Sequence, residues 1–308
     1  MDTFKDHAGM ATRRIALSTA IGALAAIVMA GMPVSAAAAA PKTIDPGKLT
    51  VGFNGDMPMT SWKDGKLIGT DGALLAHIAE DLGLEIKPQQ MEWSALIQAT
   101  KQGKVDIMLG SMGWTKERTK IMLLTDPIYY FGTFLLQKKD TNYSTFADIS
   151  GHKIGTVTGF TLVPELKSIP NVGEVKLYDT SDGVMRDLIA GRLDMAVLDP
   201  GLVEYALLQH PEWGLHQVAL VPEADKYPIM STKYYSIMGI WPEEKELYDA
   251  INKEITKAWA DCSNVKTMSA YGLGNPSWFD PPPKDYRIGV DRPDGWQAPK
   301  APASCFAK

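Results

Sequence analysis

GKVDIMLGSMGWTKER, residues 103–118, places a helix-ending glycine, an apolar strand and a run of small and polar residues in direct succession. Gly103 ends a helix predicted over 95–101, because glycine adopts the left-handed backbone of a helix C-terminus without steric cost. The apolar residues 105–109 predict a buried strand. A helix that turns directly into a buried strand is typical of an α/β domain.

The residues upstream follow the same alternation. They predict a strand at 49–53, a helix at about 72–82 with Asp71 as its N-cap, and a second strand at 84–87. Strands that are separated by helices usually pair in parallel, so we expect a largely parallel sheet.

A second array with this pattern lies further along the chain. Strands are predicted at 153–157, 174–178 and 195–198, and a helix at 182–190. Two successive arrays predict a two-lobed α/β fold, and the length of 308 residues fits two domains.

Two extended apolar runs, 132–137 and 234–240, flank the second array. We expect them to be hinge strands that cross between the lobes, which gives two hinge crossings. The predicted organisation is a signal segment, a first lobe in two pieces, a second lobe between them and a proline-rich tail packed on the surface: 1–36, then 45–135 with 234–271, then 136–233, and finally 272–308.

Composition excludes several classes of protein. Apolar residues make up 45% of the chain and charged residues 22%, which are ordinary values for a globular protein and exclude a disordered chain or a polytopic membrane protein. The net charge of -5 provides no electrostatic basis for binding nucleic acid or anionic lipid. Two cysteines and five scattered histidines exclude a cysteine-rich metal cluster, and we expect no metal and no cofactor.

The first 36 residues are predicted to be a secretory signal peptide, which implies a periplasmic protein. Arg13 and Arg14 provide a positive segment, 15–32 carries no charge, and small residues lead to a cleavage site after Ala36. A transmembrane anchor is the alternative, but the run barely reaches spanning length and is rich in alanine. The paired arginines also half-match a twin-arginine export signal, which leaves the export route open.

Cys262 and Cys305 are the two cysteines of the chain. In an oxidising compartment, two cysteines without a third predict one disulfide. We expect this bond to fix the proline-rich tail to the body of the protein.

Small, polar and aromatic residues follow the predicted strands, where open α/β sheets bind their ligands. Arg118 can hold a carboxylate with two parallel bonds, Asp199 can pair with an ammonium group, and Trp93 provides a flat apolar wall. Together these residue types predict a pocket for a zwitterion, although Asp199 before a proline is alternatively a helix cap. The residues at these strand ends are Asn54, Asp56, Trp93, Ser111, Gly113, Arg118, Gly159, Phe160, Thr161 and Asp199.

At these residues the chain resembles the bacterial extracellular solute-binding proteins of family 3, which serve polar amino-acid ABC transporters. The resemblance covers about 48–271 and implies a type II periplasmic-binding fold that closes around its ligand at a hinge. The segments that carry it include LTVG, DGKLIG, GKVDI, TKER, TDPIY and GRLDMAVLD, at 49–52, 64–69, 103–107, 115–118, 125–129 and 191–199.

The resemblance also implies a role for each part of the pocket. Arg118 holds the ligand α-carboxylate, Asp199 holds the α-ammonium group, and Trp93 packs against the ligand side chain. The residues that the resemblance places near the same carboxylate are Ser111, Gly113, Gly159 and Thr161.

Three positions depart from the family pattern. Asn54 stands where the family usually has an aspartate that can hold a distal amine, which argues against lysine or arginine as the ligand, although the nearby Asp56 can restore an acid. Phe160 replaces a small hydroxyl residue and lines or narrows the pocket. Ala73 replaces a second acid after the glycine of the DGKLIG segment.

These features predict a protein that binds an amino acid or a related zwitterion and delivers it to an ABC transporter permease in the inner membrane. We expect a monomer that does not bind nucleic acid. One alternative is a periplasmic enzyme of the cyclohexadienyl dehydratase type on the same fold, with Glu165 or Asp56 as general acid. Another is a protein that presents its ligand to a membrane sensor.

Overall fold

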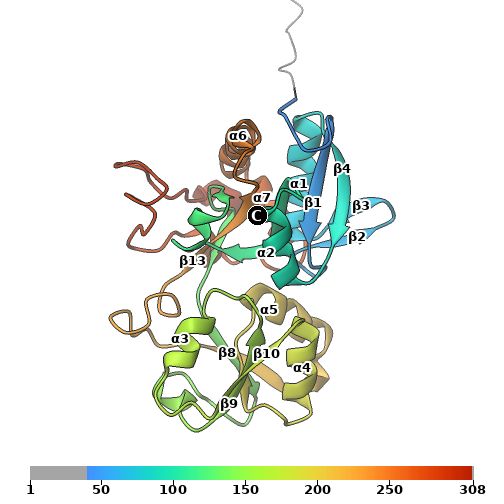
Figure 1. The fold of residues 1–308 in the computed structure, drawn as a ribbon. Helices are drawn as coiled ribbons and strands as arrows, with labels where there is room; N and C mark the ends of the chain where they lie inside the picture. The colour runs from blue at the N-terminus through green and yellow to red at the C-terminus, as the bar shows by residue number, and fades with distance from the viewer. Residues whose placement is uncertain (1–39, 307–308) are drawn as a thin grey trace, which may run out of the picture. The chain divides into compact units, whose positions relative to one another are not determined.

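The computed structural model describes residues 40–306, so the predicted signal peptide at 1–36 lies outside the described residues. The described chain forms two main β-sheets with helices packed against each (Figure 1). We term the residues that form or cover the first sheet the first lobe, and those of the second sheet the second lobe. The predicted α/β class is confirmed.

The first sheet has the strand order β4-β1-β5-β13-β6, and β7 also pairs with β13. Strand β1 runs parallel to β4 and β5, whereas β13 runs antiparallel to β5. Its strands are β1 (Lys48–Phe53), β4 (Glu85–Gln90), β5 (Ile107–Gly113), β6 (Leu123–Leu124), β7 (Tyr129–Phe131) and β13 (Tyr234–Ile240). The first lobe also has the ribbon β2 (Ser61–Lys63) with β3 (Lys66–Ile68), the helices α1 (Thr70–Asp81), α2 (Trp93–Lys101), α6 (Lys245–Asp261) and α7 (Ser263–Ser269), and the 3-10 turn η1 (Arg118–Lys120).

The second sheet has the strand order β10-β9-β11-β8-β12. Strand β9 runs parallel to β10 and β11, and β8 runs antiparallel to β11 and β12. Its strands are β8 (Phe134–Lys138), β9 (Lys153–Val157), β10 (Glu174–Tyr178), β11 (Met195–Ala196) and β12 (Leu215–Ala219). The second lobe also has the helices α3 (Val163–Ser168), α4 (Ser181–Ile189) and α5 (Pro200–Gln209), and the turns η2 (Ala147–Ile149) and η3 (Pro211–Trp213).

The chain passes between the two sheets twice, as predicted, but not through the predicted strands. The first passage is the short link between β7 and β8, and the second is the longer segment 220–233 between β12 and β13. Strand β8 pairs only within the second sheet and β13 only within the first, so neither is a crossing strand. The predicted lobe boundary after residue 135 therefore falls inside β8, and the lobe boundaries as a whole stay a prediction.

Helices cover the central strands of the first sheet, because residues on both faces of those strands are buried. In β1, five consecutive residues from Leu49 to Phe53 are buried, and all seven residues of β5 are buried. Continuous apolar strands of this kind are typical of a parallel sheet that has helices on both faces. Helices α1 and α2 contact these strands, and α6 and α7 pack against α1.

Asp71 does not cap helix α1, contrary to the sequence prediction. The helix begins at Thr70, and Gly69 occupies the N-cap position without a side-chain hydrogen bond. Asp71 lies inside the first turn and is 1% exposed. Its carboxylate therefore belongs to the interior of the first lobe rather than to the helix end.

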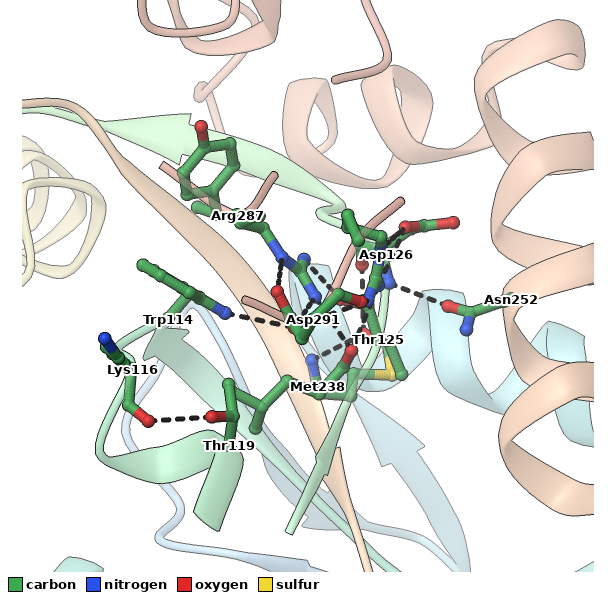
Figure 2. Close-up of polar contacts among 12 residues, drawn as sticks. Trp114, Lys116, Thr119, Thr125, Asp126, Met238, Asn252, Arg287 and Asp291 are labelled. Carbon is green, nitrogen blue, oxygen red and sulfur yellow. Dashed lines mark hydrogen bonds and ion pairs between the residues drawn. The ribbon is translucent and has the colours of Figure 1, made fainter. Parts of the chain in front are cut away.

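The proline-rich tail packs against the first lobe and contains the turns η4 (Pro276–Phe279) and η5 (Ala303–Phe306). The predicted disulfide is present: Cys262 at the end of α6 bonds to Cys305, with 5.4 Å between their Cα atoms. Arg287 of the tail is fully buried and pairs with Asp291 (Figure 2). The tail is therefore held at two places, by a covalent bond near its end and by a buried arginine near its middle.

Candidate ligand-binding site

A cavity lies between residues that follow strands of the first sheet and residues that follow strands of the second. Seven of the ten residues predicted at strand ends line it: Trp93, Ser111, Gly113, Arg118, Phe160, Thr161 and Asp199. The sequence analysis missed its other lining residues, which are Gly132, Thr133, Leu162, Val197, Leu198, Ile229 and Tyr234. The predicted residues Asn54, Asp56 and Gly159 do not line the cavity.

Arg118 provides the positive charge of the cavity. It starts the turn that follows β5, and it is 7% exposed. Its guanidinium donates to the main-chain oxygens of Gly113 at 2.5 Å and Gly159 at 3.0 Å. A guanidinium has five N–H donors, so these two bonds leave donors for a bound anion. Burial lowers the pKa of Arg118 to about 10, which keeps the side chain charged at neutral pH.

Asp199 provides a carboxylate on the other side of the cavity. It occupies the N-cap position of helix α5, as the helix-cap alternative expects, but its side chain makes no capping hydrogen bond and remains available to the cavity. Its Oδ1 accepts a hydrogen bond from the Tyr234 hydroxyl at 3.0 Å. Burial raises the pKa of Asp199 to about 7, while hydrogen bonds from Tyr234 and Ser111 oppose the rise. A cationic group in the cavity would therefore favour the ionised form.

Tyr234 is the most informative residue that the sequence analysis missed. Its hydroxyl bonds Asp199 and also lies 3.4 Å from the Ser111 Oγ, so it contacts side chains from both lobes. Strand β13 runs antiparallel to β5 and pairs Ser236 with Gly113, which brings the first residue of β13 beside the last residues of β5. Tyr234 could have been identified from the sequence, because it is the first residue of the predicted strand at 234–240 and has a side chain that is both aromatic and polar.

Aromatic rings form the apolar part of the cavity. Trp93 and Phe160 come from different lobes and meet edge to face, with 6.3 Å between ring centroids. Gly159 precedes Phe160 and has a φ of 87°, a left-handed backbone conformation that favours glycine. The Trp93 Nε1 is buried without a hydrogen-bond partner among the described residues. This indole therefore offers both a flat wall and an open donor.

Asn54 and Asp56 make structural contacts instead of lining the cavity. The Asn54 Oδ1 accepts from the Thr60 hydroxyl at 3.4 Å. The Asp56 Oδ2 accepts from the Ser181 hydroxyl of α4 at 2.7 Å, which links the two lobes outside the cavity. Burial raises the pKa of Asp56 above its ordinary value.

The two carboxylates considered as general acids are both engaged elsewhere. Glu165 of α3 accepts hydrogen bonds from the main-chain N–H groups of Ile229 and Met230, each at 2.8 Å. Asp56 accepts from Ser181, as described above. Neither lines the cavity, so the structure offers no support for acid catalysis by these residues.

Comparison with known proteins identifies a family profile that covers most of the chain. Residues 49–272 match the bacterial extracellular solute-binding proteins, family 3. The chain is 29% identical over 157 residues to the probable amino-acid-binding protein YxeM of Bacillus subtilis, an alignment that covers 50% of this chain and 60% of the relative. It is 27% identical over 160 residues to the arginine-binding extracellular protein ArtP of the same organism, with 51% and 63% covered. The chain thus spans less than two thirds of the length of these two relatives.

A solved structure extends the likeness to the whole fold. An ancestral arginine-binding protein bound to arginine superposes with a TM-score of 0.64 at 26% sequence identity, covering 73% of this chain and 98% of that one. This likeness confirms the predicted two-lobed type II periplasmic-binding fold. The family match ends at 272, so the tail that follows lies outside it.

Proposed function

The chain belongs to the bacterial extracellular solute-binding proteins, family 3, and we propose that it binds an amino acid or a closely related zwitterion between its lobes. The observation that carries this proposal is one cavity lined by both a buried arginine, Arg118, and a carboxylate, Asp199. These two groups come from different lobes. A ligand with one negative and one positive end can therefore satisfy both charges at once.

The hydrogen-bonding pattern supports one orientation of the ligand. The ligand carboxylate meets the free N–H groups of Arg118, because carboxylates match the planar fork of a guanidinium. The ligand ammonium meets Asp199, whose carboxylate lines the cavity and accepts a hydrogen bond from Tyr234. The ligand side chain then packs against Trp93 and Phe160, and this apolar wall favours a side chain with an apolar or planar part.

Contacts between the lobes support a mechanism in which the lobes close over the ligand. Arg118 bonds the main chain of Gly159, Asp56 bonds Ser181 and Tyr234 bonds Asp199, so three hydrogen bonds join the lobes at or beside the cavity. An amino acid therefore enters a form in which these contacts are open, and closure then surrounds it.

We also propose that the protein acts in the periplasm together with an ABC transporter permease. The predicted signal peptide at 1–36 supports export to the periplasm, and the family supports delivery of the ligand to an ABC transporter permease. Among residues 40–306, no helix has the length and apolar character needed to cross a bilayer. We propose that the exported chain acts as a monomeric carrier.

Thermal unfolding in the presence of single ligands tests the proposed function. The exported chain would be freed of co-purified ligand by unfolding and refolding, and then heated with each of the twenty L-amino acids. A ligand at a hundred times its Kd adds about 2.7 kcal/mol to stability, which raises Tm by several degrees. The matching amine and keto acid should give no shift, since each lacks one of the two charges. If no amino acid shifts Tm, the zwitterion site is wrong.

A further inference from the structure

Asp71 has a buried carboxylate that no ligand contact uses. It lies in the first turn of α1, is 1% exposed and does not line the cavity. It accepts hydrogen bonds from the main-chain N–H of Ser111 at 2.8 Å, from the Tyr129 hydroxyl at 2.9 Å and from the Thr70 hydroxyl at 2.8 Å. A buried carboxylate with three donors is well satisfied, so it can hold each donor firmly in place.

Ser111, whose main-chain N–H donates to Asp71, has an unusual backbone conformation. The φ angle of Ser111 is 54°, in the left-handed region that favours glycine, and the preceding Gly110 has a φ of 125°. A serine costs about 1 kcal/mol or more in this conformation, so the surrounding structure must hold it there. The hydrogen bond to Asp71 is the contact that fixes its N–H group.

Ser111 in turn contacts the polar side of the cavity. Its Oγ lies 3.4 Å from the Tyr234 hydroxyl, and that hydroxyl donates to Asp199 at 3.0 Å. Ser111 and Tyr234 both line the cavity. A shift of the Ser111 backbone would therefore move a lining hydroxyl and disturb the partner of Asp199.

We propose that Asp71 is a positioning residue for ligand binding, which holds Ser111 in its left-handed backbone and thereby orders the Ser111–Tyr234–Asp199 contacts of the cavity. This inference rests on the proposed function, because it assigns Asp71 a role in that same site. Asp71 acts through Ser111 and does not touch the ligand.

Asp71→Asn tests this role, with Thr70→Val as the matched control. The amide keeps one acceptor oxygen and replaces the other with an NH2 donor, so it cannot accept from the Ser111 N–H on one side and from the Tyr129 and Thr70 hydroxyls on the other. Thr70→Val removes a donor to the same carboxylate on the side away from Ser111. Titration calorimetry would use the L-amino acid that raises the Tm of the wild-type chain most. We expect about tenfold weaker binding for Asp71→Asn and an unchanged Kd for Thr70→Val.

A double-variant cycle separates positioning from general damage. If Asp71 acts through Ser111, Asp71→Asn combined with Ser111→Ala should weaken binding no more than the stronger of the two single changes. Full additivity of the two losses would overturn the proposal, as would equal losses in Asp71→Asn and Thr70→Val.

Amide hydrogen exchange gives a readout that needs neither a ligand nor a variant. The Ser111 N–H of the wild-type chain should exchange slowly without ligand, because it is bonded to a buried carboxylate. Rapid exchange at Ser111 would overturn the proposal even if Asp71→Asn does not fold. Failure of the proposed function looks different: Arg118→Ala then leaves amino-acid binding intact, whereas Ser111 exchange remains slow.

Discussion

The Nη2 of Arg118 donates a hydrogen bond to the main-chain oxygen of Gly159 at 3.0 Å, across the boundary between the lobes. A carbonyl oxygen satisfies a donor but carries no net charge. The buried guanidinium therefore still lacks a full counter-anion in its immediate hydrogen-bonding shell, and a ligand carboxylate can provide one. Because the same side chain bonds the second lobe, the proposed ligand binding and lobe closure would be coupled at this residue.

Replacing Arg118 with lysine should separate charge from geometry. Arg118→Lys keeps the positive charge, but a single ammonium cannot bond Gly113, Gly159 and a ligand carboxylate together. We expect amino-acid binding to weaken about tenfold or more, measured by calorimetry. Arg192→Lys is the control, since Arg192 is exposed and pairs with Asp187 in the second lobe. An unchanged Kd in Arg118→Lys would contradict the assigned role.

Ligand affinity should depend on pH through Asp199. Burial raises the pKa of Asp199 to about 7, with smaller contributions from the Asp56 and Asp71 carboxylates. A ligand ammonium favours the ionised carboxylate, so binding below pH 7 requires the loss of a proton. We expect the affinity for an amino acid to fall by up to about tenfold per pH unit below 7 and to level off above about pH 8. Calorimetry across this range measures the profile.

The free energy of unfolding of the ligand-free protein should fall as pH rises, whereas ligand affinity should increase. A folded-state pKa above the unfolded value means that the folded chain binds more protons between about pH 4 and 7, so this carboxyl contributes less stability as pH rises through that window. Asp199→Asn removes the effect and should add about 2 kcal/mol to the unfolding free energy at pH 8, with little change at pH 4. The same variant should lose amino-acid binding. If Asp199→Asn instead lowers the free energy of unfolding at pH 8, the buried Asp199 carboxylate does not destabilise the ligand-free fold.

The sequence predicts the elements that depend on local pattern. Strands β9, β10 and β13 have their predicted bounds, and a glycine, proline or aspartate lies within two residues of at least one end of each. Strand β5 is longer than predicted. The small residues after Leu109 read as a loop, whereas Gly110 and Ser111 continue the strand with positive φ angles.

Local sequence patterns do not identify contacts between residues that are distant in the chain. Asp71 resembles a helix cap in the sequence, but its partner Ser111 lies 40 residues away. The role of Asp56 as a ligand contact stays a prediction, and the sequence does not indicate its bond to Ser181 at a separation of 125 residues. The tail is expected to pack on the body of the protein, but the sequence does not indicate that Arg287 bonds the main chain of Leu124 across 163 residues. A local pattern carries no information about such pairings.

A methyl group at Gly201 should disfavour closure. Gly201 lies in α5 of the second lobe, and a Cβ there would come within 2.7 Å of both Met59 and Phe131 of the first lobe and 3.2 Å of Leu273 of the tail. These contacts exist only while the lobes are together, so opening relieves the overlap. Overpacking of this kind costs about 1–3 kcal/mol, and we expect Gly201→Ala to bind an amino acid about tenfold more weakly.

The control for Gly201→Ala is a second helical glycine whose neighbours all lie within one lobe. A Cβ at Gly183 in α4 would lie 3.2 Å from Thr180 and Tyr178, which both belong to the second lobe. Gly183→Ala should therefore leave the Kd unchanged. Small-angle scattering with saturating amino acid should show a larger radius of gyration for Gly201→Ala. Equal affinities of the two variants would exclude a closure contact at Gly201.

The disulfide should stabilise the fold without affecting the ligand site. Cys262 and Cys305 are separated by 43 residues, and closing a loop of that length contributes about 4 kcal/mol in the chain-entropy description. Neither cysteine lines the cavity. We expect the double serine variant to unfold at lower urea concentration and to bind an amino acid with an unchanged Kd. Weaker binding in this variant would show that the end of the tail influences the cavity.

Arg287 should hold the tail even without the disulfide. Its guanidinium donates to the main-chain oxygens of Thr125 at 2.7 Å and Leu124 at 2.9 Å and pairs with Asp291 at 2.6 Å, as Figure 2 shows for Thr125 and Asp291. Arg287→Met removes the donor to the buried Thr125 oxygen, whereas Leu124 and Asp291 keep a hydrogen bond from Arg292. We therefore expect a loss of about 1–3 kcal/mol in unfolding free energy.

Proteolysis distinguishes this anchor from the disulfide. In Arg287→Met the tail stays bonded through Cys305 but should become accessible to protease between the two anchors. Arg192→Met is the control, since it breaks an exposed ion pair with Asp187 and should change stability by no more than about 1 kcal/mol. A tail that resists protease in Arg287→Met, with stability equal to that of the control, would show that the buried arginine is not an anchor.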